Sequence, residues 1–410
     1  MPAADRIHVA RQPILDLQQR VTGYELLYRA DAADRSYVGG TTQASARVLS
    51  DALVGMGLET LTDGRRAFLN LSTEVLLSDA SSLLDPKTVV LELLEDVRVT
   101  PDVVEVCRSL AARGYQLALD DFVPGSDAEQ LLPHARYVKL DVLSLAPDVL
   151  AAHAPRLLAG GLTLLAEKVE TPAMVATAAG LGCTLFQGYY FCRPHTMTMR
   201  PLSASQVTQM RLVAALLQPS ASILQVEDLL KHDASLTYRI LRCVNSAGYG
   251  VRREIRSIRD ALLLVGLDQV RKWASLWALA GVNRGPAELA TMTILRARTC
   301  ELVGAALGHA DHGAGYFLLG LCSLLDALLQ HPMPQVIADL PLGAEIRAAL
   351  LGEPTPARRV LDAVVLHERG AFDEAIAAGE PAGLDAGVLA TAAAEALAWA
   401  HGVQTAARAA

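Results

Sequence analysis

The stretch Leu117-Ala118-Leu119-Asp120-Asp121-Phe122 decides which fold and which chemistry this chain can have. It is a short apolar run of the kind found in β-strands, and it ends in two adjacent carboxylates. Side chains alternate across a strand, so the two aspartates would face opposite sides while the strand stays regular. Where the backbone turns at the strand end, both can converge on one point and bind a metal ion. Alternatively, one aspartate caps the next helix while the other is solvated.

The sequence around this stretch, up to about Pro194, alternates short apolar runs with helical stretches. Repeated alternation of strand and helix predicts a parallel sheet. About eight such units favour a (β/α) barrel over an open sheet, although periodicity alone cannot separate the two. The runs are 8–15, 21–28, 67–71, 89–94, 116–121, 137–142, 162–167 and 185–191.

Polar residues lie in or at the end of nearly every one of these runs. A barrel gathers the C-terminal ends of its strands around one pocket, so we expect these side chains to share a site. Each residue alone could equally be a cap or a solvated surface group. The residues are Glu25, Asn70, Glu92, Asp120, Asp121, Lys139, Asp141, Glu167, Glu170 and Gln187.

Several carboxylates and a carboxamide in one pocket form an all-oxygen site, which suits Mg²⁺ or Mn²⁺. So many negative groups could not ionise together without cations. Two metal ions about 4 Å apart are the usual device for in-line attack on a phosphodiester. Lys139 could hold the attacking water or balance charge, and Arg29 suits a phosphate clamp because guanidinium binds phosphate oxygens bidentately.

The first 195 or so residues resemble the EAL domain family of cyclic diguanylate phosphodiesterases. The resemblance implies a modified TIM barrel with one strand reversed, which hydrolyses cyclic diguanylate to linear diguanylate with Mg²⁺ or Mn²⁺. The matching pieces are Arg11-Gln12-Pro13-Ile14, Gly23-Tyr24-Glu25-Leu26-Leu27-Tyr28-Arg29, Phe68-Leu69-Asn70, Leu91-Glu92-Leu93-Leu94-Glu95, Asp120-Asp121-Phe122, Lys139-Leu140-Asp141, Ala166-Glu167-Lys168-Val169-Glu170 and Gln187-Gly188-Tyr189.

The same resemblance implies a role for each matching residue. Lys139 would contact the attacking water, Arg29 and Gln12 the substrate, and Gln187 the metal–water network, while Glu170 would brace the loop after the aspartate pair. The implied catalytic residues are Glu25, Lys139, Glu167 and Gln187. The implied metal ligands are Glu25, Asn70, Glu92 and Asp120 for the first ion, and Asp121, together with Glu167, for the second ion and its waters.

Two departures from the family pattern bear on activity. The family tripeptide Glu-Ala-Leu is here Glu25-Leu26-Leu27, a change at a position that should only form a wall. Active members usually follow the aspartate pair with Phe-Gly-Thr-Gly, whereas this chain has Phe122-Val123-Pro124-Gly125. Valine is stiff, and proline fixes φ and removes an amide donor, so we expect slow turnover or binding without turnover. The alternative function is therefore a cyclic diguanylate sensor or a protein-interaction adaptor.

The second half shows helical periodicity instead. We expect an EAL domain over 1–196, a linker over 197–209 and an all-helical domain with a C-terminal helical extension over 210–410. Residues 229–282 resemble the HDOD domain, a relative of the HD phosphohydrolases, which implies a regulatory or output module that binds a signalling protein. His232-Asp233 is interpreted as a helix cap rather than a metal site, and Trp273 and Trp277 as core.

Composition limits the class of protein. The 410 residues are 52% hydrophobic and carry a net charge of −8, which argues against a nucleic-acid coat or a membrane-surface protein. An arginine-rich stretch near Arg256 could contact an anionic partner, or its arginines could pair with nearby acids. The six separated cysteines, with no signal peptide or membrane-spanning run, predict a cytoplasmic protein. The oligomeric state stays open, with a dimer or a monomer compatible with the sequence.

Overall fold

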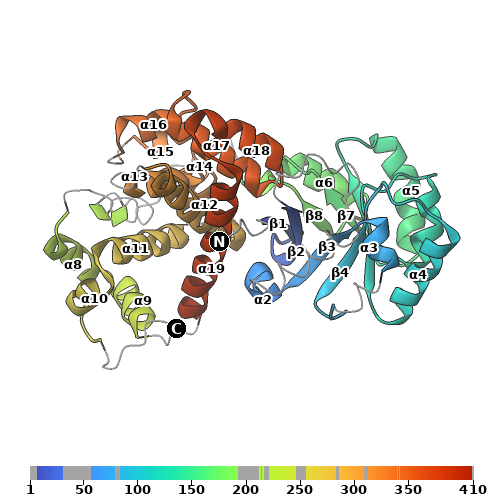
Figure 1. Cartoon of the computed structure of the whole chain (residues 1–410), viewed down its shortest axis with the longest axis horizontal. Coiled ribbons are helices and arrows are strands. Elements are labelled where there is room, and N and C mark those ends of the chain that lie inside the picture. The colour runs from blue at the N-terminus through green and yellow to red at the C-terminus, as the bar shows by residue number, and fades with distance from the viewer. Residues whose placement is uncertain are drawn as a thin grey trace. The chain divides into compact units, whose positions relative to one another are not determined.

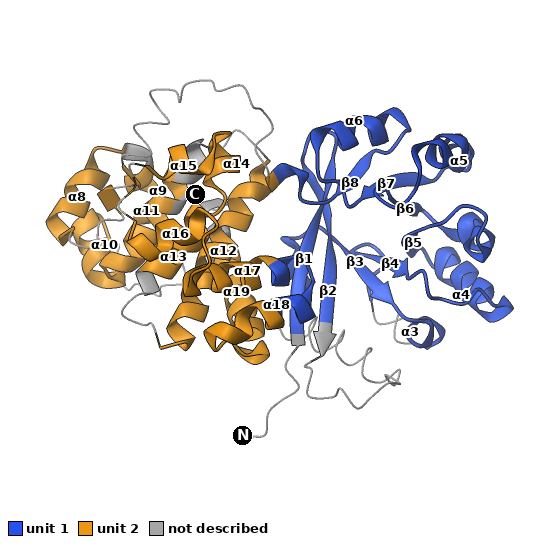
Figure 2. Ribbon diagram, turned by 90° about the horizontal axis from the view of Figure 1, so that it is seen from above, with its two compact units in different colours: residues 1–191, 366–375 blue, residues 192–365, 376–410 orange. Residues whose placement is uncertain are grey.

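The structure is a computed structural model that describes residues 7–30, 57–78, 84–192, 212–213, 215–216, 221–245, 255–282, 286–308, 313–338, 340 and 342–408. The chain forms two compact units (Figure 2). Unit 1 comprises residues 1–191 and 366–375, and unit 2 comprises residues 192–365 and 376–410. The predicted linker, 197–209, lies outside the described residues.

Unit 1 is built on a closed barrel in which the eight strands follow one another in chain order (Figure 1). Strand β1 is antiparallel to both of its neighbours, β2 and β8, and all other neighbouring strands are parallel. The predicted modified TIM barrel with one reversed strand is confirmed. The strands are β1 (Ile7–Asp16), β2 (Val21–Ala30), β3 (Arg66–Leu71), β4 (Val89–Leu93), β5 (Gln116–Leu119), β6 (Tyr137–Asp141), β7 (Thr163–Glu167) and β8 (Leu185–Gln187).

Two strands end two or more residues earlier than the apolar runs indicated. Strand β5 stops at Leu119, so both aspartates follow the strand rather than belong to it. Strand β8 stops at Gln187 because Gly188 has a φ of +145° and is followed by a short 3₁₀ helix, η4 (Tyr190–Cys192). A side chain at Gly188 would meet the backbone of Val169 at 2.1 Å, so only glycine fits beside the loop after β7.

Two helices of unit 1, α4 (Pro101–Ala112) and α6 (Pro172–Gly180), begin at the same kind of cap. Thr100 and Thr171 each accept a hydrogen bond from a backbone N–H in the first turn, and a proline follows each threonine. The described helices of this unit are α2 (Leu58–Thr62), α3 (Thr73–Leu77), α4 (Pro101–Ala112), η3 (Asp127–His134), α5 (Pro147–Ala159) and α6 (Pro172–Gly180).

Unit 2 is helical throughout its described residues, as predicted. Helix α12 packs against both α13 and α19. On α11, Trp273 and Trp277 are buried with ring centroids 6.1 Å apart, which confirms their interpretation as core. The helices are α8 (Ile223–Lys231), α9 (Ala234–Val244), α10 (Ile258–Val265), α11 (Leu267–Val282), α12 (Ala287–Ala306), α13 (Gly313–Cys322), α14 (Leu325–Leu329), α15 (Met333–Val336), α16 (Ala344–Leu350), α17 (Pro356–Glu368), α18 (Phe372–Gly379), η7 (Glu380–Ala382) and α19 (Ala386–Arg408).

His232-Asp233 forms the junction between α8 and α9. The Asp233 Oδ1 atom accepts a hydrogen bond from the Leu236 backbone N–H at 3.0 Å, so this carboxylate caps α9. The ring Nδ1 of His232 lies 2.7 Å from the carbonyl oxygen of Asp228 in the preceding helix. Both groups are thus used in local capping, which confirms the structural interpretation of this pair.

No helix among the described residues is long and apolar enough to cross a bilayer.

The turn between α17 and α18 supplies the part of unit 1 that comes from late in the sequence. His367 and Phe372 pack with His8 of β1, and the three ring centroids lie 5.0 to 5.5 Å apart. Burial, with a smaller contribution from His8, lowers the pKa of His367 to about 3. The neutral form of His367 is therefore the one that the folded chain accommodates.

We expect acid to destabilise this packing. A histidine whose pKa is depressed by folding stabilises the protein above its ordinary pKa, and this stability is lost as the pH falls from about 6.5 towards 3. Between pH 7.5 and pH 4.5 the wild type should lose on the order of a few kcal/mol of unfolding free energy through His367. His367→Gln should therefore show a smaller fall in melting temperature over the same pH range. His153→Gln, at a partly exposed position of α5, is the control. Identical pH profiles for His367→Gln and the wild type would contradict the assignment.

Candidate active site

The barrel interior consists of an apolar layer followed by a polar layer. The apolar layer contains Ile14, Phe68, Val90, Ala118 and Leu165. Residues two apart in a strand point to the same face, so the next inward position on each strand lies towards the carboxyl end of the barrel. The resulting pairs are Phe68 with Asn70, Val90 with Glu92, Ala118 with Asp120, and Leu165 with Glu167. On the reversed strand β1 the direction is inverted, and Ile14 is paired with Gln12.

The centre of the polar layer is the buried ammonium of Lys139. This group lies within ion-pair distance of four carboxylates from four different parts of the chain. The distances from Nζ are 2.7 Å to Asp120, 3.0 Å to Glu167, 3.1 Å to Glu92 and 3.2 Å to Glu25. Lys139, Glu92 and Glu25 are at most 5% exposed. The barrel therefore holds more negative than positive charge at this point.

Three carboxamides extend this centre around Glu25. Asn70 Nδ2 donates to Glu25 Oε1 at 2.9 Å, and Gln187 Nε2 donates to Glu25 Oε2 at 2.6 Å. Gln187 Nε2 also donates to Oε1 of Gln12 at 2.8 Å. The Tyr28 hydroxyl donates to the backbone carbonyl of Asn70, which fixes the end of β3 next to the site. Glu25 is thereby oriented from both sides.

The excess of carboxylates changes their acidity. Burial works to raise the pKa of Glu25, but the Lys139 charge and the hydrogen bonds from Gln187 and Asn70 outweigh it and hold the pKa below its ordinary value. Burial raises the pKa of Glu92 well above the ordinary range despite Lys139. Burial and repulsion from Asp120 and Glu25 likewise raise the pKa of Glu167 to about 8. Without further cations, some of these groups take up protons near neutral pH.

The donor set fits a divalent metal ion, although the described carboxylates converge on Lys139 rather than on a preformed metal-binding point. Four buried oxygens of the polar layer accept no hydrogen bond from any described residue, and they are Asn70 Oδ1, Glu92 Oε2, Glu167 Oε2 and Gln187 Oε1. Buried acceptors without donors are costly, and all four are hard oxygen ligands of the type that Mg²⁺ and Mn²⁺ prefer.

The two adjacent aspartates have separate partners. Asp120 reaches Lys139, whereas Asp121 lies 3.3 Å from the Nζ of Lys168. Lys168 also lies 2.6 Å from Asp141, whose pKa it helps to lower to about 2 against the effect of burial. Asp121 and Lys168 have positive φ angles of 40° and 55°. This strained backbone, which splits the pair, occurs at functional sites more often than elsewhere.

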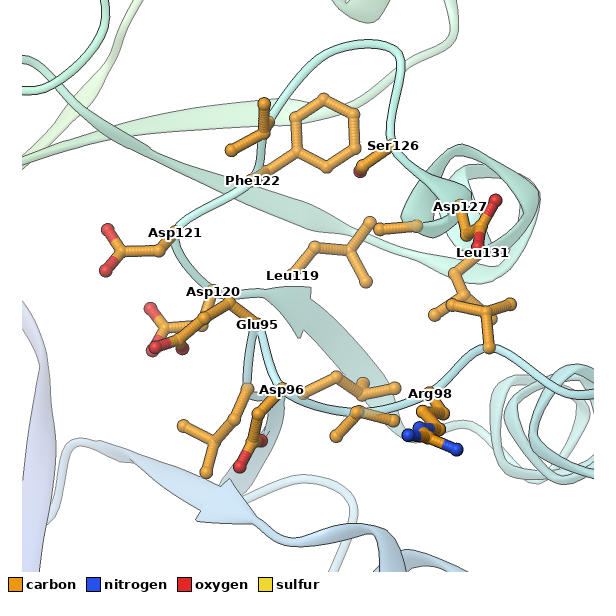
Figure 3. A pocket seen from close by; sticks show the side chains of 16 residues that line it. Glu95, Asp96, Arg98, Leu119, Asp120, Asp121, Phe122, Ser126, Asp127 and Leu131 are labelled. Atoms are coloured by element: carbon orange, nitrogen blue, oxygen red, sulfur yellow. The ribbon is translucent and has the colours of Figure 1, made fainter.

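The chain after the aspartates forms a tight turn. Ser126 N–H donates to the Val123 carbonyl at 3.2 Å, with Pro124 and Gly125 in the two central positions and a φ of +84° at Gly125. This is a type II turn, for which the Pro-Gly sequence is favoured. Figure 3 shows the turn above a cavity of about 300 Å³, with Asp120 and Asp121 on one side and Arg98 on the other. Gly125 N–H also donates to Glu129 Oε1 at 2.9 Å, so the turn is held both by its own backbone hydrogen bond and by the following 3₁₀ helix.

Family models account for both halves of the chain. The EAL domain matches residues 1–194 and the HDOD domain matches residues 202–328. Over 381 residues the chain is 32% identical to the uncharacterized protein YuxH of Bacillus subtilis, covering 90% of this chain and 92% of that protein. This chain belongs to the EAL family and carries an HDOD domain.

A second relative of this EAL–HDOD chain is the cyclic di-GMP phosphodiesterase CdgJ of Vibrio cholerae. The two are 33% identical over 360 residues, which is 87% of this chain and 83% of the relative. The manganese and cyclic-di-GMP complex of Klebsiella pneumoniae BlrP1 is a similar solved structure. It is 22% identical, with a TM-score of 0.39, and the match covers 46% of this chain and 56% of that chain.

The EAL barrel brings together most, but not all, of the residues predicted from the sequence. Glu170 is exposed after β7, and its bracing role stays a prediction. Arg29 lies in β2, but its side chain is outside the described part. Sequence reasoning missed Lys168 as the partner of Asp121, although a lysine directly after the Glu167 strand end was the available signal. It also missed the backbone carbonyl of Arg369, which accepts a hydrogen bond from Gln12 Nε2 at 2.8 Å and for which the sequence has no signal.

We expect metal stabilisation of this EAL barrel to increase with pH. A carboxyl whose pKa is raised by folding stabilises the metal-free protein below its ordinary pKa, and that stability is lost as the pH rises towards about 8. The difference in melting temperature between Mg²⁺ and EDTA samples should therefore be larger at pH 8 than at pH 6. Glu167→Gln should flatten the profile of the EDTA sample. A difference independent of pH would contradict the role of these carboxyls.

Proposed function

We propose that this EAL–HDOD chain is a metal-dependent phosphodiesterase that hydrolyses cyclic di-GMP to linear diguanylate. The observation that supports it most directly is the set of four buried carboxylates around Lys139, with acceptor oxygens left free of donors. The relationship to the Vibrio cholerae phosphodiesterase supports the choice of substrate.

The residues of this chain divide the task in the proposed reaction. Glu25, Asn70, Glu92 and Asp120 would hold one metal ion, and Asp121 and Glu167 the other. Bound Mg²⁺ or Mn²⁺ would supply charge compensation for the phosphodiester and a water of lowered pKa. Lys139 favours the ionised form of the carboxylates around it, most effectively at Glu25, and can hold a water by hydrogen bonding. Arg29 would bind a phosphate oxygen, because a guanidinium fork matches that geometry.

Loss of Glu25 should abolish turnover. Glu25→Ala removes the acceptor of the Asn70, Lys139 and Gln187 hydrogen bonds, and it should lower kcat/KM by on the order of a thousandfold, or about 4 kcal/mol. The measurement is chromatographic detection of linear diguanylate from the purified chain with Mn²⁺. Glu105→Ala, at an exposed position of α4, should behave as wild type. No product from the wild type after long incubation would refute the enzyme.

The second candidate function is a cyclic di-GMP sensor that binds without turnover. It is favoured by the hydrogen-bonded Pro-Gly turn over 123–126 and by the pairing of Asp121 with Lys168, which holds this carboxylate away from the Lys139 cluster. Calorimetric binding of cyclic di-GMP without product formation would select the sensor. In either case we propose that the HDOD half transmits the signal to a protein partner, on the strength of its family match.

The turn provides a test between slow enzyme and sensor. Val123→Gly combined with Pro124→Thr restores Phe-Gly-Thr-Gly and removes both the stiff valine and the fixed φ of proline. If the turn limits turnover, the double variant should raise kcat by several-fold with little change in the binding of cyclic di-GMP. The same double substitution in the Glu25→Ala background is the control and should stay inactive. An unchanged or lower kcat would show that the turn is not the limiting feature.

A further inference from the structure

The turn Leu366–Ala375 reaches the polar layer through a continuous chain of hydrogen bonds. Gln12 Nε2 donates to the backbone carbonyl of Arg369 at 2.8 Å. The other end of the same carboxamide, Gln12 Oε1, accepts from Gln187 Nε2, which also donates to Glu25. A backbone carbonyl more than 340 residues away in sequence thus fixes the orientation of the amide next to Glu25.

The path of this turn is set by Gly370. It ends α17 in a Schellman motif, in which Ala371 N–H donates to Leu366 and Gly370 N–H donates to His367, with a φ of +74° at the glycine. A Cβ atom at Gly370 would lie 2.3 Å from Cδ1 of Leu27 on β2, two residues from Glu25. The turn therefore lies against the strand that carries Glu25, and the space between Gly370 and Leu27 is too small for any side chain at position 370.

One further contact holds the turn in place, and a cavity adjoins it. The Arg369 guanidinium lies 4.7 Å from the ring centroid of Tyr189, two residues after Gln187. The turn also lines a cavity of about 450 Å³ together with Asn70 and Tyr28. The same turn thus contacts Gln12 and Tyr189 and borders the cavity beside Asn70.

We propose that Arg369 and Gly370 are positioning residues of the active site, which act through Gln12 and Gln187 on Glu25. The proposal rests on the proposed function for its activity readout, but not for its metal-binding readout. If the turn is displaced, the Gln12 amide loses the Arg369 carbonyl as its acceptor and can rotate. Gln187 then loses the fixed position of Gln12 Oε1, and its hydrogen bond to Glu25 is no longer held in one geometry. The expected result is weaker metal binding and a lower kcat with little change in overall stability.

The test uses two matched glycines of the full chain. Gly383 ends another helical turn in the same Schellman pattern with a φ of +80°, but its nearest side-chain atom outside the turn would be 3.9 Å from an added Cβ. Gly370→Ala and Gly383→Ala therefore share the backbone strain and differ in the contact with Leu27. The readouts are the Mn²⁺ dissociation constant by electron paramagnetic resonance without nucleotide, kcat and KM for cyclic di-GMP, and the melting temperature.

We expect Gly370→Ala to raise the Mn²⁺ dissociation constant about tenfold, a size typical of residues that orient metal ligands, while Gly383→Ala changes it less than twofold. In a Gln12→Met background the effect of Gly370→Ala should largely disappear, because both changes break the same chain of hydrogen bonds. Equal effects of the two glycine variants, or effects that multiply with Gln12→Met, would overturn the positioning role.

The two proposals can fail separately. If the wild type binds Mn²⁺ but neither binds nor cleaves cyclic di-GMP, the proposed function fails, and the Mn²⁺ comparison of the variants still decides the positioning role. If the wild type is active and the glycine variants are indistinguishable, only the positioning role fails. Absence of Mn²⁺ binding by the wild type would overturn both.

Discussion

The ion cluster of Lys139 with four carboxylates is the interaction on which the rest of the barrel depends. A single ammonium cannot neutralise four buried carboxylates, and leaving such charges unpaired is far more costly than packing apolar groups in their place. The barrel tolerates this arrangement because carboxamides orient Glu25, because burial raises the pKa of Glu92 and Glu167 and so favours their neutral forms, and because the apolar layer below is closely packed. Such an arrangement is better suited to binding cations than to stabilising a fold.

The fold could be predicted from the sequence because its signal is local. Alternating apolar runs and helices predicted a parallel sheet and favoured a barrel, and the family resemblance implied the modified barrel with its reversed strand. The polar layer could also be predicted from the sequence. Its members lie two residues after a buried apolar residue, at the carboxyl end of a parallel strand, as Asp120 does after Ala118. Its members were predicted as a group, and the structure brings Glu25, Asn70, Glu92, Asp120, Lys139, Glu167 and Gln187 together.

What could not be predicted depends on backbone geometry and on distant contacts. The positive φ angle at Asp121 sends this side chain to Lys168 while its neighbour reaches Lys139, and two identical residues give no sequence signal for such a split. Likewise, the hydrogen bond from Gln12 to Arg369 joins positions with no pattern in common, and it involves a backbone carbonyl that every residue possesses. Local periodicity contains no information on either feature.

The EAL family match and the compact barrel unit are different sets of residues. The match covers residues 1–194, whereas the unit also includes residues 366–375. A barrel that ended at the boundary of the family match would lack His367 and Gly370, which lie against His8 and Leu27. Exchange of the second half of the sequence between related genes therefore has to preserve residues 366–375, because the barrel unit includes them.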